Sequence, residues 1–317
     1  MEIQKKEETL NININFFCNQ KCIFCSEGDK SQFNFLKDYK DENYYKRIES
    51  GNLKYKKIVF TTGEPTLHKN IFKYINYAGN YYYNTISMIT NGSTLIDFNI
   101  RNQIINSSLN EIIISIHGSN SKIHDYITNV NGAFDNVMKG LILLKKDGYK
   151  GKINISYVLN KYNLHDFLSS VKLFSKLGIN LHLINVMRPE GNGKIHKDKL
   201  SITYNEFINY FLKLKEKDII FINSLIGQNK LNIMDIPICI LKDSKLNISG
   251  YGKVEIMNNS SNENKECINN TLNNKTKLKI CNFCKYNNEC EGLYKDYLNI
   301  NENFKLKPII DYQFNKG

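Results

Sequence analysis

The chain has 317 residues, of which 41% are hydrophobic and 12% are aromatic. This is enough to bury a large core, and we expect one large domain with a smaller appendage. No segment approaches the roughly 18 consecutive apolar residues of a membrane span, and the N-terminus lacks the apolar core and cleavage site of a secretion signal. We therefore expect a cytoplasmic protein with no membrane partner. Its eight cysteines indicate metal or redox chemistry, because the cytosol keeps thiols reduced.

The formal net charge is +12 and the isoelectric point is near 9.1, which would suit a nucleic acid or another polyanion as partner. Lys and Asn are nevertheless abundant along the whole chain, including the predicted helices. We therefore favour a general bias in composition over a phosphate-binding patch, and a nucleic-acid partner stays open only as an alternative.

Short β-branched runs alternate with amphipathic stretches, in the order strand then helix, about six times. The predicted strands are 10–17, 56–61, 84–90, 111–117, 152–159 and 180–187. The clearest helices are predicted at 71–78, 134–146 and 164–177, the last ending at Gly178 as a helix C-cap would. This order predicts an α/β fold with a parallel sheet. Six units are too few to close the usual eight-stranded barrel, so we expect a partial (β/α)6 TIM-like barrel with its active site at the C-terminal strand ends.

The alternation fades after Lys217, and from about Ile233 the chain is rich in turns and polar residues. We therefore expect the partial barrel at residues 1–232 and a small C-terminal domain at 233–317. The segment 259–277 is expected to form a mobile surface loop.

The first motif is a group of three cysteines with the spacing C-x3-C-x2-C. Cys18, Cys22 and Cys25 follow the first predicted strand directly, and the next cysteine is Cys239. A structural zinc site or a complete ferredoxin-type cluster would need a fourth thiolate nearby. Three thiolates on a four-iron cube instead leave one iron open, which a substrate or cofactor can coordinate. Unrelated buried cysteines or a zinc knuckle are the alternatives.

This motif, with the aromatic Phe24 before its last cysteine, resembles the CxxxCxxC signature of the radical S-adenosylmethionine (SAM) superfamily. The resemblance implies that Cys18, Cys22 and Cys25 hold a [4Fe-4S] cluster whose fourth iron binds the amino and carboxylate groups of SAM. Reductive cleavage of SAM would give methionine and a 5′-deoxyadenosyl radical, which takes a hydrogen atom from the substrate. It also implies an electron donor such as flavodoxin or ferredoxin.

The turn Thr62-Gly63-Glu64-Pro65 follows the second predicted strand and resembles the GGEP motif of this family, with Thr in place of the first Gly. A turn that exposes carbonyl groups beside a carboxylate suits the methionyl ammonium group of SAM, which offers three donors. We expect the Thr to alter little, although it restricts φ at that position.

Polar residues at the ends of the next strands resemble the SAM contacts of the family. The hydroxyl and amide groups there can bind the ribose and the carboxylate of SAM. For Ser115 and His117 a buried polar pair is the alternative, and His117 could equally contact the substrate. By position, Asn160 corresponds to a ribose contact and Met187 to Pro189 to a backbone segment that faces the adenine. The residues concerned are Asn91, Ser115, His117, Asn160 and Met187.

A second cysteine group has the spacing C-x2-C-x5-C and consists of Cys281, Cys284 and Cys290. Three soft ligands in this arrangement suit an iron–sulfur cluster or zinc. A fourth ligand must come from elsewhere. Cys239 is the first choice, and it precedes an expected hairpin that turns at Gly250 and Gly252.

This region resembles the SPASM and twitch extensions of radical SAM enzymes, which carry auxiliary [4Fe-4S] clusters. The match is partial, because Met257 and Tyr294 stand where two of the pattern's cysteines would be. Both losses affect the same one of the two clusters in a full SPASM domain. The resemblance therefore implies one auxiliary cluster, held by Cys281, Cys284, Cys290 and Cys239. Cys267 could replace Cys239, could donate a hydrogen atom as in the peptide epimerases that this chain resembles, or could be a free thiol in a polar loop.

Radical SAM enzymes with such a domain often modify ribosomally made peptides by epimerisation, thioether formation or carbon–carbon crosslinking, and we expect a peptide substrate. Because only 17 residues precede Cys18, we expect no leader-binding domain there. An enzyme that acts on a small molecule or on RNA is one alternative. A non-catalytic iron–sulfur or zinc protein that senses redox state or binds RNA is another.

Overall fold

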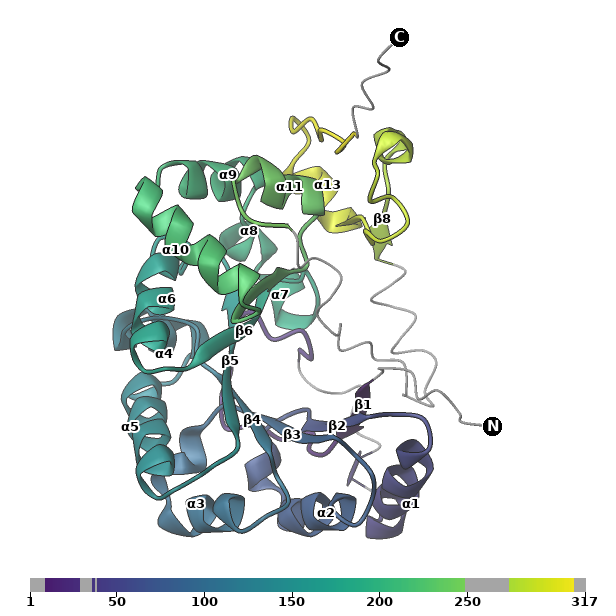
Figure 1. The fold of residues 1–317 in the computed structure, drawn as a ribbon, viewed down its shortest axis with the longest axis vertical. Coiled ribbons are helices and arrows are strands. Elements are labelled where there is room, and N and C mark those ends of the chain that lie inside the picture. Colours follow the sequence, from purple (N-terminus) through teal and green to yellow (C-terminus); the bar gives the residue numbers. More distant parts are fainter. Residues whose placement is uncertain (1–8, 29–35, 38, 249–273, 311–317) are drawn as a thin grey trace.

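A computed structural model describes residues 9–28, 36–37, 39–248 and 274–310 (Figure 1). The hairpin expected at Gly250 and Gly252, most of the expected loop 259–277, Met257 and Cys267 lie outside the described residues.

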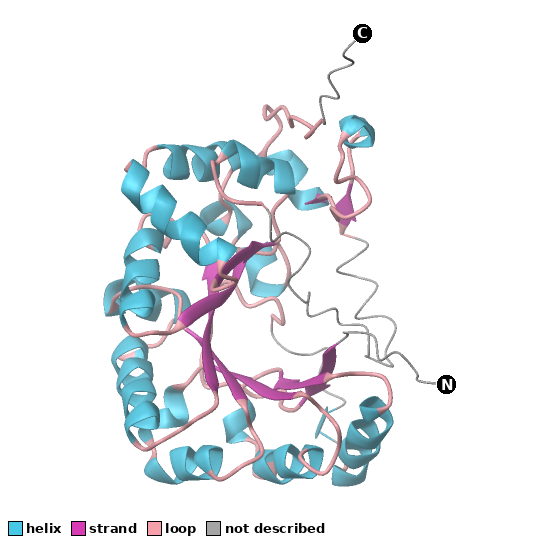
Figure 2. Cartoon of the chain, viewed as in Figure 1, coloured by secondary structure: helices cyan, strands magenta, loops and turns pink. Residues whose placement is uncertain are grey.

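Seven parallel strands form one curved sheet, in the order in which they occur along the chain (Figure 2). Each strand pairs with the next, as in the register Leu10↔Ile58 and Ile58↔Ile86. The prediction of a partial TIM-like barrel is confirmed. The strands are β1 (Thr9–Asn13), β2 (Lys57–Thr61), β3 (Thr85–Thr90), β4 (Glu111–Ser115), β5 (Lys152–Leu159), β6 (Asn180–Val186) and β7 (Leu231–Met234).

Helices cover the convex side of this sheet, as Figure 1 shows. The predicted helix at 71–78 agrees with the structure, and the one at 134–146 begins one residue earlier. No helix in the described ranges has the length and apolarity needed to cross a bilayer. The helices are α1 (Asp41–Asn52), α2 (Ile71–Ala78), α3 (Phe98–Ile105), α4 (Ser121–Thr128), α5 (Ala133–Lys146), α6 (Phe167–Lys176), α7 (Gly191–Ile195), α8 (Lys197–Leu200), α9 (Tyr204–Leu212), α10 (Glu216–Gly227), α11 (Ile238–Asp243) and α13 (Lys295–Ile300), with 3-10 turns η2 (Pro65–Leu67), η3 (Ser93–Ile96) and η4 (Lys279–Phe283).

The sheet extends beyond the barrel expected from the sequence. β7 pairs in parallel with β6 through Leu181↔Leu231 and Ile184↔Ile233, and this seventh strand was not predicted. Four residues are too few for hydrophobic periodicity to mark a strand. The boundary predicted at residue 232 therefore falls inside β7, and the sheet ends at Met234.

The C-terminal part is small, and it packs against the barrel. Its strands β8 (Lys275–Thr276) and β9 (Leu293–Tyr294) form an antiparallel pair. The Tyr297 hydroxyl in α13 donates to the Met187 carbonyl at 3.1 Å, and the Tyr297 ring stacks on Tyr204 of α9 with 5.9 Å between centroids. The small C-terminal domain expected from the sequence is present.

The two faces of the sheet differ in polarity. Successive side chains of a strand point to opposite faces, and one set, which includes Leu10, Ile58, Met88 and Ile112, is buried in the hydrophobic core. The alternate set faces the concave side. Its buried polar members include Thr9, Asn11, Ser87, Glu111 and Asn154. Buried Val59 and Ile113 share this face, so the interior of the barrel is lined by polar and apolar groups together.

A charged pair closes the N-terminal end of this polar interior. The Glu111 carboxylate, whose side chain is 4% exposed, lies 2.7 Å from the Lys57 ammonium and accepts from the Asn154 amide at 2.8 Å. The Lys152 ammonium is farther away at 3.7 Å and is 51% exposed. Burial has the largest single effect on the Glu111 carboxyl and would raise its pKa. The charge and hydrogen bond of Lys57, with smaller contributions from Ser87 and Lys152, together outweigh burial and hold this pKa below its usual value.

Removing Lys57 should destabilise the barrel far more than removing Lys152. Lys57→Met leaves a buried carboxylate without its close cation, and we expect the free energy of unfolding at pH 7 to fall by about 3 kcal/mol. Lys152→Met removes a half-exposed charge and should cost less than about 1 kcal/mol. Urea denaturation measures both losses, and equal losses would contradict this assignment.

The Lys57 effect should also depend on pH. Since the folded pKa of Glu111 lies below its unfolded value, the pair stabilises the protein above that unfolded value, and the stabilisation is lost as pH falls through the folded pKa. The difference between wild type and Lys57→Met should therefore shrink as pH is lowered below about 4.5.

Candidate functional site

The three N-terminal cysteines lie on a loop that follows β1 and has no regular secondary structure. The loop is held by the last turn of α4, where the carbonyls of Ile127 and Thr128 accept from the amides of Ile23 and Lys21 at 3.0 and 3.1 Å. The cysteine loop, residues 18–25, is thus fixed through its backbone at the C-terminal end of the sheet. The sulfur atoms remain available for a metal cluster.

The cysteine side chains are partly exposed, and none forms a disulfide. The backbone amide of Gln20 lies 3.5 Å from the Cys18 sulfur, and the Asn91 side-chain amide lies 3.8 Å from it. Donors directed at a sulfur tune a cluster bound to it. Asn91, predicted as a SAM contact, therefore also reaches the cysteine loop from the end of β3.

The backbone of the turn 62–65 contacts the backbone of the cysteine segment, by which we mean residues 15–25, the cysteine loop with the three residues before it. Thr62 and Gly63 both have left-handed conformations, with φ of 75° and 61°. A Cβ atom on Gly63 would lie 2.4 Å from the carbonyl oxygens of both Asn15 and Phe17. Only glycine fits there. For the β-branched Thr62 this conformation is strained, and its hydroxyl donates to Asn13 at 2.9 Å.

The Glu64 carboxylate is fully buried and is occupied by protein donors. One oxygen accepts from the hydroxyls of Thr66 and Thr90, both at 2.6 Å, and the other accepts from the Asn91 amide at 2.7 Å. Burial raises the pKa of this carboxyl, and these hydrogen bonds oppose the rise. The carboxylate therefore ties β2 to β3. Because the carboxylate is occupied, an ammonium group would contact this turn through its backbone carbonyl groups.

His117 and His124 form a pair of buried, neutral imidazoles behind the cysteine loop. Nδ1 of His117 accepts from the Val158 amide at 3.1 Å, and Nδ1 of His124 accepts from the His117 amide at 3.0 Å. Burial lowers the pKa of His117 well below its usual value and that of His124 to about 4. The Phe24 ring packs edge-on against His117 with 4.7 Å between centroids. The pair supports the aromatic residue that precedes Cys25.

The other predicted SAM contacts differ in how much of each side chain is available. Ser115 at the end of β4 is partly exposed and pairs in register with Ser156 of β5. Asn160 is buried, and its amide bonds the backbone of Val158 and Tyr162 at 3.1 and 3.0 Å. Asn160 therefore shapes the turn after β5.

Met187 follows β6 and is buried as well. Its amide donates to the Leu159 carbonyl at 2.9 Å, and its own carbonyl accepts from Tyr297. The peptide groups on both sides of Met187 are thus bonded to protein, which fixes the position of the segment that leads into Pro189.

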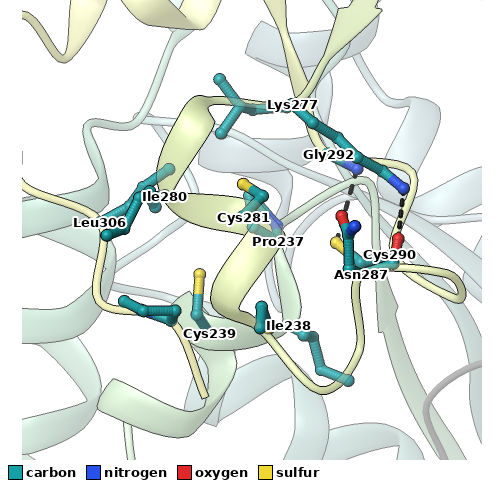
Figure 3. Close-up of a pocket in the computed structure, with 13 residues that line it drawn as sticks. Pro237, Ile238, Cys239, Lys277, Ile280, Cys281, Asn287, Cys290, Gly292 and Leu306 are labelled. Carbon is teal, nitrogen blue, oxygen red and sulfur yellow. Dashed lines mark hydrogen bonds between the residues drawn. The ribbon is translucent and has the colours of Figure 1, made fainter. Parts of the chain in front are cut away.

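The C-terminal cysteines surround one cavity with Cys239. The cavity is lined by all four cysteines, among them Cys239 near the start of α11 and Cys281 on η4 (Figure 3). The Gly292 amide donates to the Cys290 sulfur at 3.4 Å. Cys239 thus lies with the three cysteines of the second motif, although at least 41 residues of chain separate it from them.

Four thiols around one cavity are ligands that suit an iron–sulfur cluster or a zinc ion. Thiolates around one zinc lie about 3.8 Å apart, because each Zn–S bond is about 2.3 Å long in a tetrahedron. In the described part of the chain, no three His, Cys, Asp or Glu side chains are arranged to hold a single metal ion. Burial and the neighbouring thiols raise the pKa of Cys239 to about 12, so a thiolate there needs the positive charge of a bound metal.

Tyr294, which stands where a further SPASM cysteine would be, has a structural role. Its hydroxyl donates to the Asp235 carboxylate at 3.1 Å, and Arg188 donates to the same carboxylate at 2.8 Å. Lys275 of β8 lies 3.5 Å from Asp235. This polar network joins the ends of β6 and β7 to the C-terminal strands.

Sequence analysis missed the segment 191–193. The Asn192 amide donates to the Cys25 carbonyl at 2.8 Å, and the Asn192 side chain donates to the Cys22 carbonyl at 3.1 Å. A Cβ atom on Gly191 would lie 2.5 Å from the Cys25 carbonyl oxygen. The Gly-Asn-Gly sequence after Pro189 predicts a turn, but it does not predict that this turn contacts the cysteine loop.

The structure brings together the two motifs that resemble the radical SAM superfamily. These are the cysteine loop at the C-terminal strand ends and the turn 62–65 packed beside it. The family model of the radical SAM superfamily matches residues 12–174. The chain belongs to the radical SAM superfamily. Members of this superfamily are enzymes that bind SAM and a [4Fe-4S] cluster, and in this chain Cys18, Cys22 and Cys25 lie together as free thiols on the cysteine loop.

Similar proteins fall into two groups. A probable GTP 3′,8-cyclase of Saccharolobus islandicus is 27% identical over 216 residues, covering 66% of this chain and 68% of that protein. Among solved structures, anSMEcpe with bound AdoMet and Kp18Cys peptide has a TM-score of 0.56 at 17% identity, covering 95% of this chain and 93% of that one.

With the Cp18Cys peptide, anSMEcpe superposes with a TM-score of 0.51 at 20% identity, over 72% of this chain and 63% of that chain. Streptococcus suis SuiB bound to precursor peptide SuiA has a TM-score of 0.54 at 16% identity, and the match covers 72% of this chain and 48% of SuiB. This chain therefore spans about half the length of SuiB. At these identities the superpositions establish a common fold.

Gly63→Ala should disrupt the contact between the turn and the cysteine segment. The added methyl group would meet two carbonyl oxygens at 2.4 Å in a left-handed conformation, and we expect a loss of about 3 kcal/mol or more in the free energy of unfolding. Gly132→Ala is the matched control, since Gly132 has φ of 77° but nothing within 4 Å of its Cβ position. It should cost only about 1–2 kcal/mol.

Chemical denaturation measures both losses, and iron bound after anaerobic reconstitution reports on the cysteine loop. Gly63→Ala should reduce this iron while Gly132→Ala leaves it unchanged. Equal losses in both variants would show that the close approach of Gly63 to Asn15 and Phe17 is unimportant.

Proposed function

We propose that this protein is a radical SAM enzyme with one auxiliary [4Fe-4S] cluster that modifies a ribosomally made peptide. The observation that carries the auxiliary cluster is the cavity lined by Cys239, Cys281, Cys284 and Cys290. The three-cysteine loop leaves one iron of its cluster open, whereas four thiols around the C-terminal cavity can complete a cube. The first cluster would thus bind SAM, and the second would have no open iron.

The residues around the cysteine loop have distinct roles in this proposal. The backbone of the turn 62–65 receives the ammonium group of SAM, and Glu64 holds that turn in place. Ser115, at the partly exposed end of β4, binds SAM through its hydroxyl, and Asn91 contacts both the loop and SAM. His117, Asn160 and Met187 act mainly by positioning Phe24 and the ends of β5 and β6.

A peptide substrate is supported by the likeness to anSMEcpe and SuiB, whose structures contain bound peptides. The superposition on anSMEcpe extends over 95% of this chain and so includes the C-terminal part as well as the barrel. The polar side chains on the concave face of the sheet suit the amides of an extended peptide, because each buried amide needs a hydrogen-bond partner.

A nucleotide substrate is the second candidate. Its support is the 27% identity to a probable GTP 3′,8-cyclase over 216 residues, which exceeds the identity to either peptide-bound structure. The net charge of +12 would also favour a triphosphate or RNA.

Cysteine variants should separate the two clusters. Wild-type protein should bind about eight irons after reconstitution, four in each cluster, and both Cys22→Ala and Cys239→Ala should lose about four. Cys22→Ala should abolish reductive SAM cleavage while the C-terminal cluster stays loaded. Cys239→Ala should alter only the auxiliary cluster, as iron analysis and EPR can show.

Each of these variants has an outcome that contradicts the proposal. If Cys22→Ala still cleaves SAM, the assignment of Cys22 to the N-terminal cluster is wrong. Unchanged iron content and an unchanged EPR spectrum in Cys239→Ala would indicate that Cys267, and not Cys239, is the fourth ligand.

The substrate class is tested by release of 5′-deoxyadenosine from anaerobically reconstituted, reduced enzyme. The enzyme is given SAM with the small-peptide fraction of its source cell, with GTP or with the RNA fraction. We expect stimulation by peptides alone. Stimulation by GTP alone would establish the second candidate, and stimulation by RNA alone would overturn both.

A further inference from the structure

The first cluster of the proposed function must receive one electron for each SAM cleaved, and the inference below rests on that cluster. The structure has a groove on the solvent side of the cysteine loop. It has a volume of about 760 Å³ and is lined by Ile23, Lys122, Asp125, Tyr126, Asn129 and His196, among others.

The groove lies directly against the cluster-binding segment. Ile23, one of its lining residues, is bonded through the chain to Cys22, and its amide donates to the Ile127 carbonyl of α4 at 3.0 Å. On the other side, His196 follows α7, which begins with the segment that bonds the Cys25 and Cys22 carbonyls through Asn192. A molecule seated in the groove would thus be separated from the cluster by one layer of protein backbone.

Lys122 lines the groove, and the charge of Lys199 acts on Tyr126, another of its lining residues. Four exposed lysines lie on the cysteine loop, α4, α7 and α8, and among the described residues none of them forms an ion pair with a carboxylate: Lys21, Lys122, Lys194 and Lys199. Asp125 also lines the groove, but its carboxylate accepts from the amides of Gly132 and Phe134 at 2.7 and 2.8 Å. Asp198 is the exposed acid nearby in the chain. The surface therefore suits a negatively charged partner.

Two exposed tyrosines lie at the same place. The Tyr126 ring on α4 is 52% exposed and the Tyr162 ring is 40% exposed, and their hydroxyls are 2.8 Å apart. Tyrosine is enriched at protein interfaces because it offers apolar area with a polar tip. Flat aromatic surface beside lysines can contact a flavin ring while the lysines contact the acidic protein that carries it.

We propose that this groove is the docking surface for an acidic, flavodoxin-type electron donor. The anionic flavin hydroquinone gives one electron to the oxidised N-terminal cluster and becomes the neutral semiquinone. No bond forms or breaks, and no proton needs to move. Charge attraction positions the donor, so binding weakens as salt concentration rises.

The test compares two double charge reversals in the holoenzyme. Lys122→Glu with Lys199→Glu changes the groove. Lys146→Glu with Lys176→Glu makes the same change of charge in the last turns of α5 and α6, at the opposite ends of these helices from the cysteine loop. The probe is a recombinant bacterial flavodoxin. Its dissociation constant and the rate at which its hydroquinone reduces the cluster, followed by EPR, are measured at low salt and at 0.5 M salt (about a 4 Å Debye length).

We expect the groove variant to bind flavodoxin at least about tenfold more weakly at low salt and to be reduced correspondingly more slowly. Reduction by dithionite should be unchanged in both variants. Unchanged binding in the groove variant, or an equal loss in the control variant, would overturn the proposal. So would RNA that binds at the groove when flavodoxin does not. Failure of wild-type enzyme to cleave SAM with dithionite would instead count against the proposed function, because binding of flavodoxin is measured independently of activity.

Discussion

The buried carboxylate of Glu64 is the interaction on which the N-terminal site depends. It accepts from Thr66 and Thr90 at 2.6 Å and from Asn91 at 2.7 Å. A buried carboxylate is unfavourable unless donors surround it, and here they come from two neighbouring strand ends. The turn that Glu64 fixes then meets the cysteine segment through Gly63. The cysteine loop, which lacks regular structure, takes its shape from these contacts and from those of Asn192.

Much of the fold and part of the site could be predicted from local sequence. The strand at 152–159 and the helix at 71–78 agree with the structure because hydrophobic periodicity is a local property. The four residues of β7 were missed, since so short a strand gains its stability from pairing with β6 rather than from its own pattern. The contact of Asn192 with the cysteine loop was missed for a related reason: a contact between residues far apart in the chain leaves no mark on either segment alone.

The two cysteine groups are held in different ways. The N-terminal loop is bonded to its neighbours through backbone groups, which leaves its sulfurs on one side. The C-terminal group instead gathers thiols from separate elements, with Cys239 on α11 and Cys281 on η4. Arg188 and Lys275 both bond Asp235 and so connect the barrel with the C-terminal strands. Asp235 therefore links the C-terminal strands to the end of β6, from which the chain continues into the segment that bonds the cysteine loop.

The open barrel has a mechanical consequence. In a closed barrel, strand number and shear fix the diameter, because every strand is paired on both sides. Here β1 and β7 are the two ends of the described sheet, and each pairs with one strand only. The curvature of the sheet can thus change without breaking a single ladder hydrogen bond. The width of the interior then depends on how the loops and the C-terminal part pack. The same sheet can therefore accommodate substrates of different size while the end that carries the cysteine loop keeps its geometry.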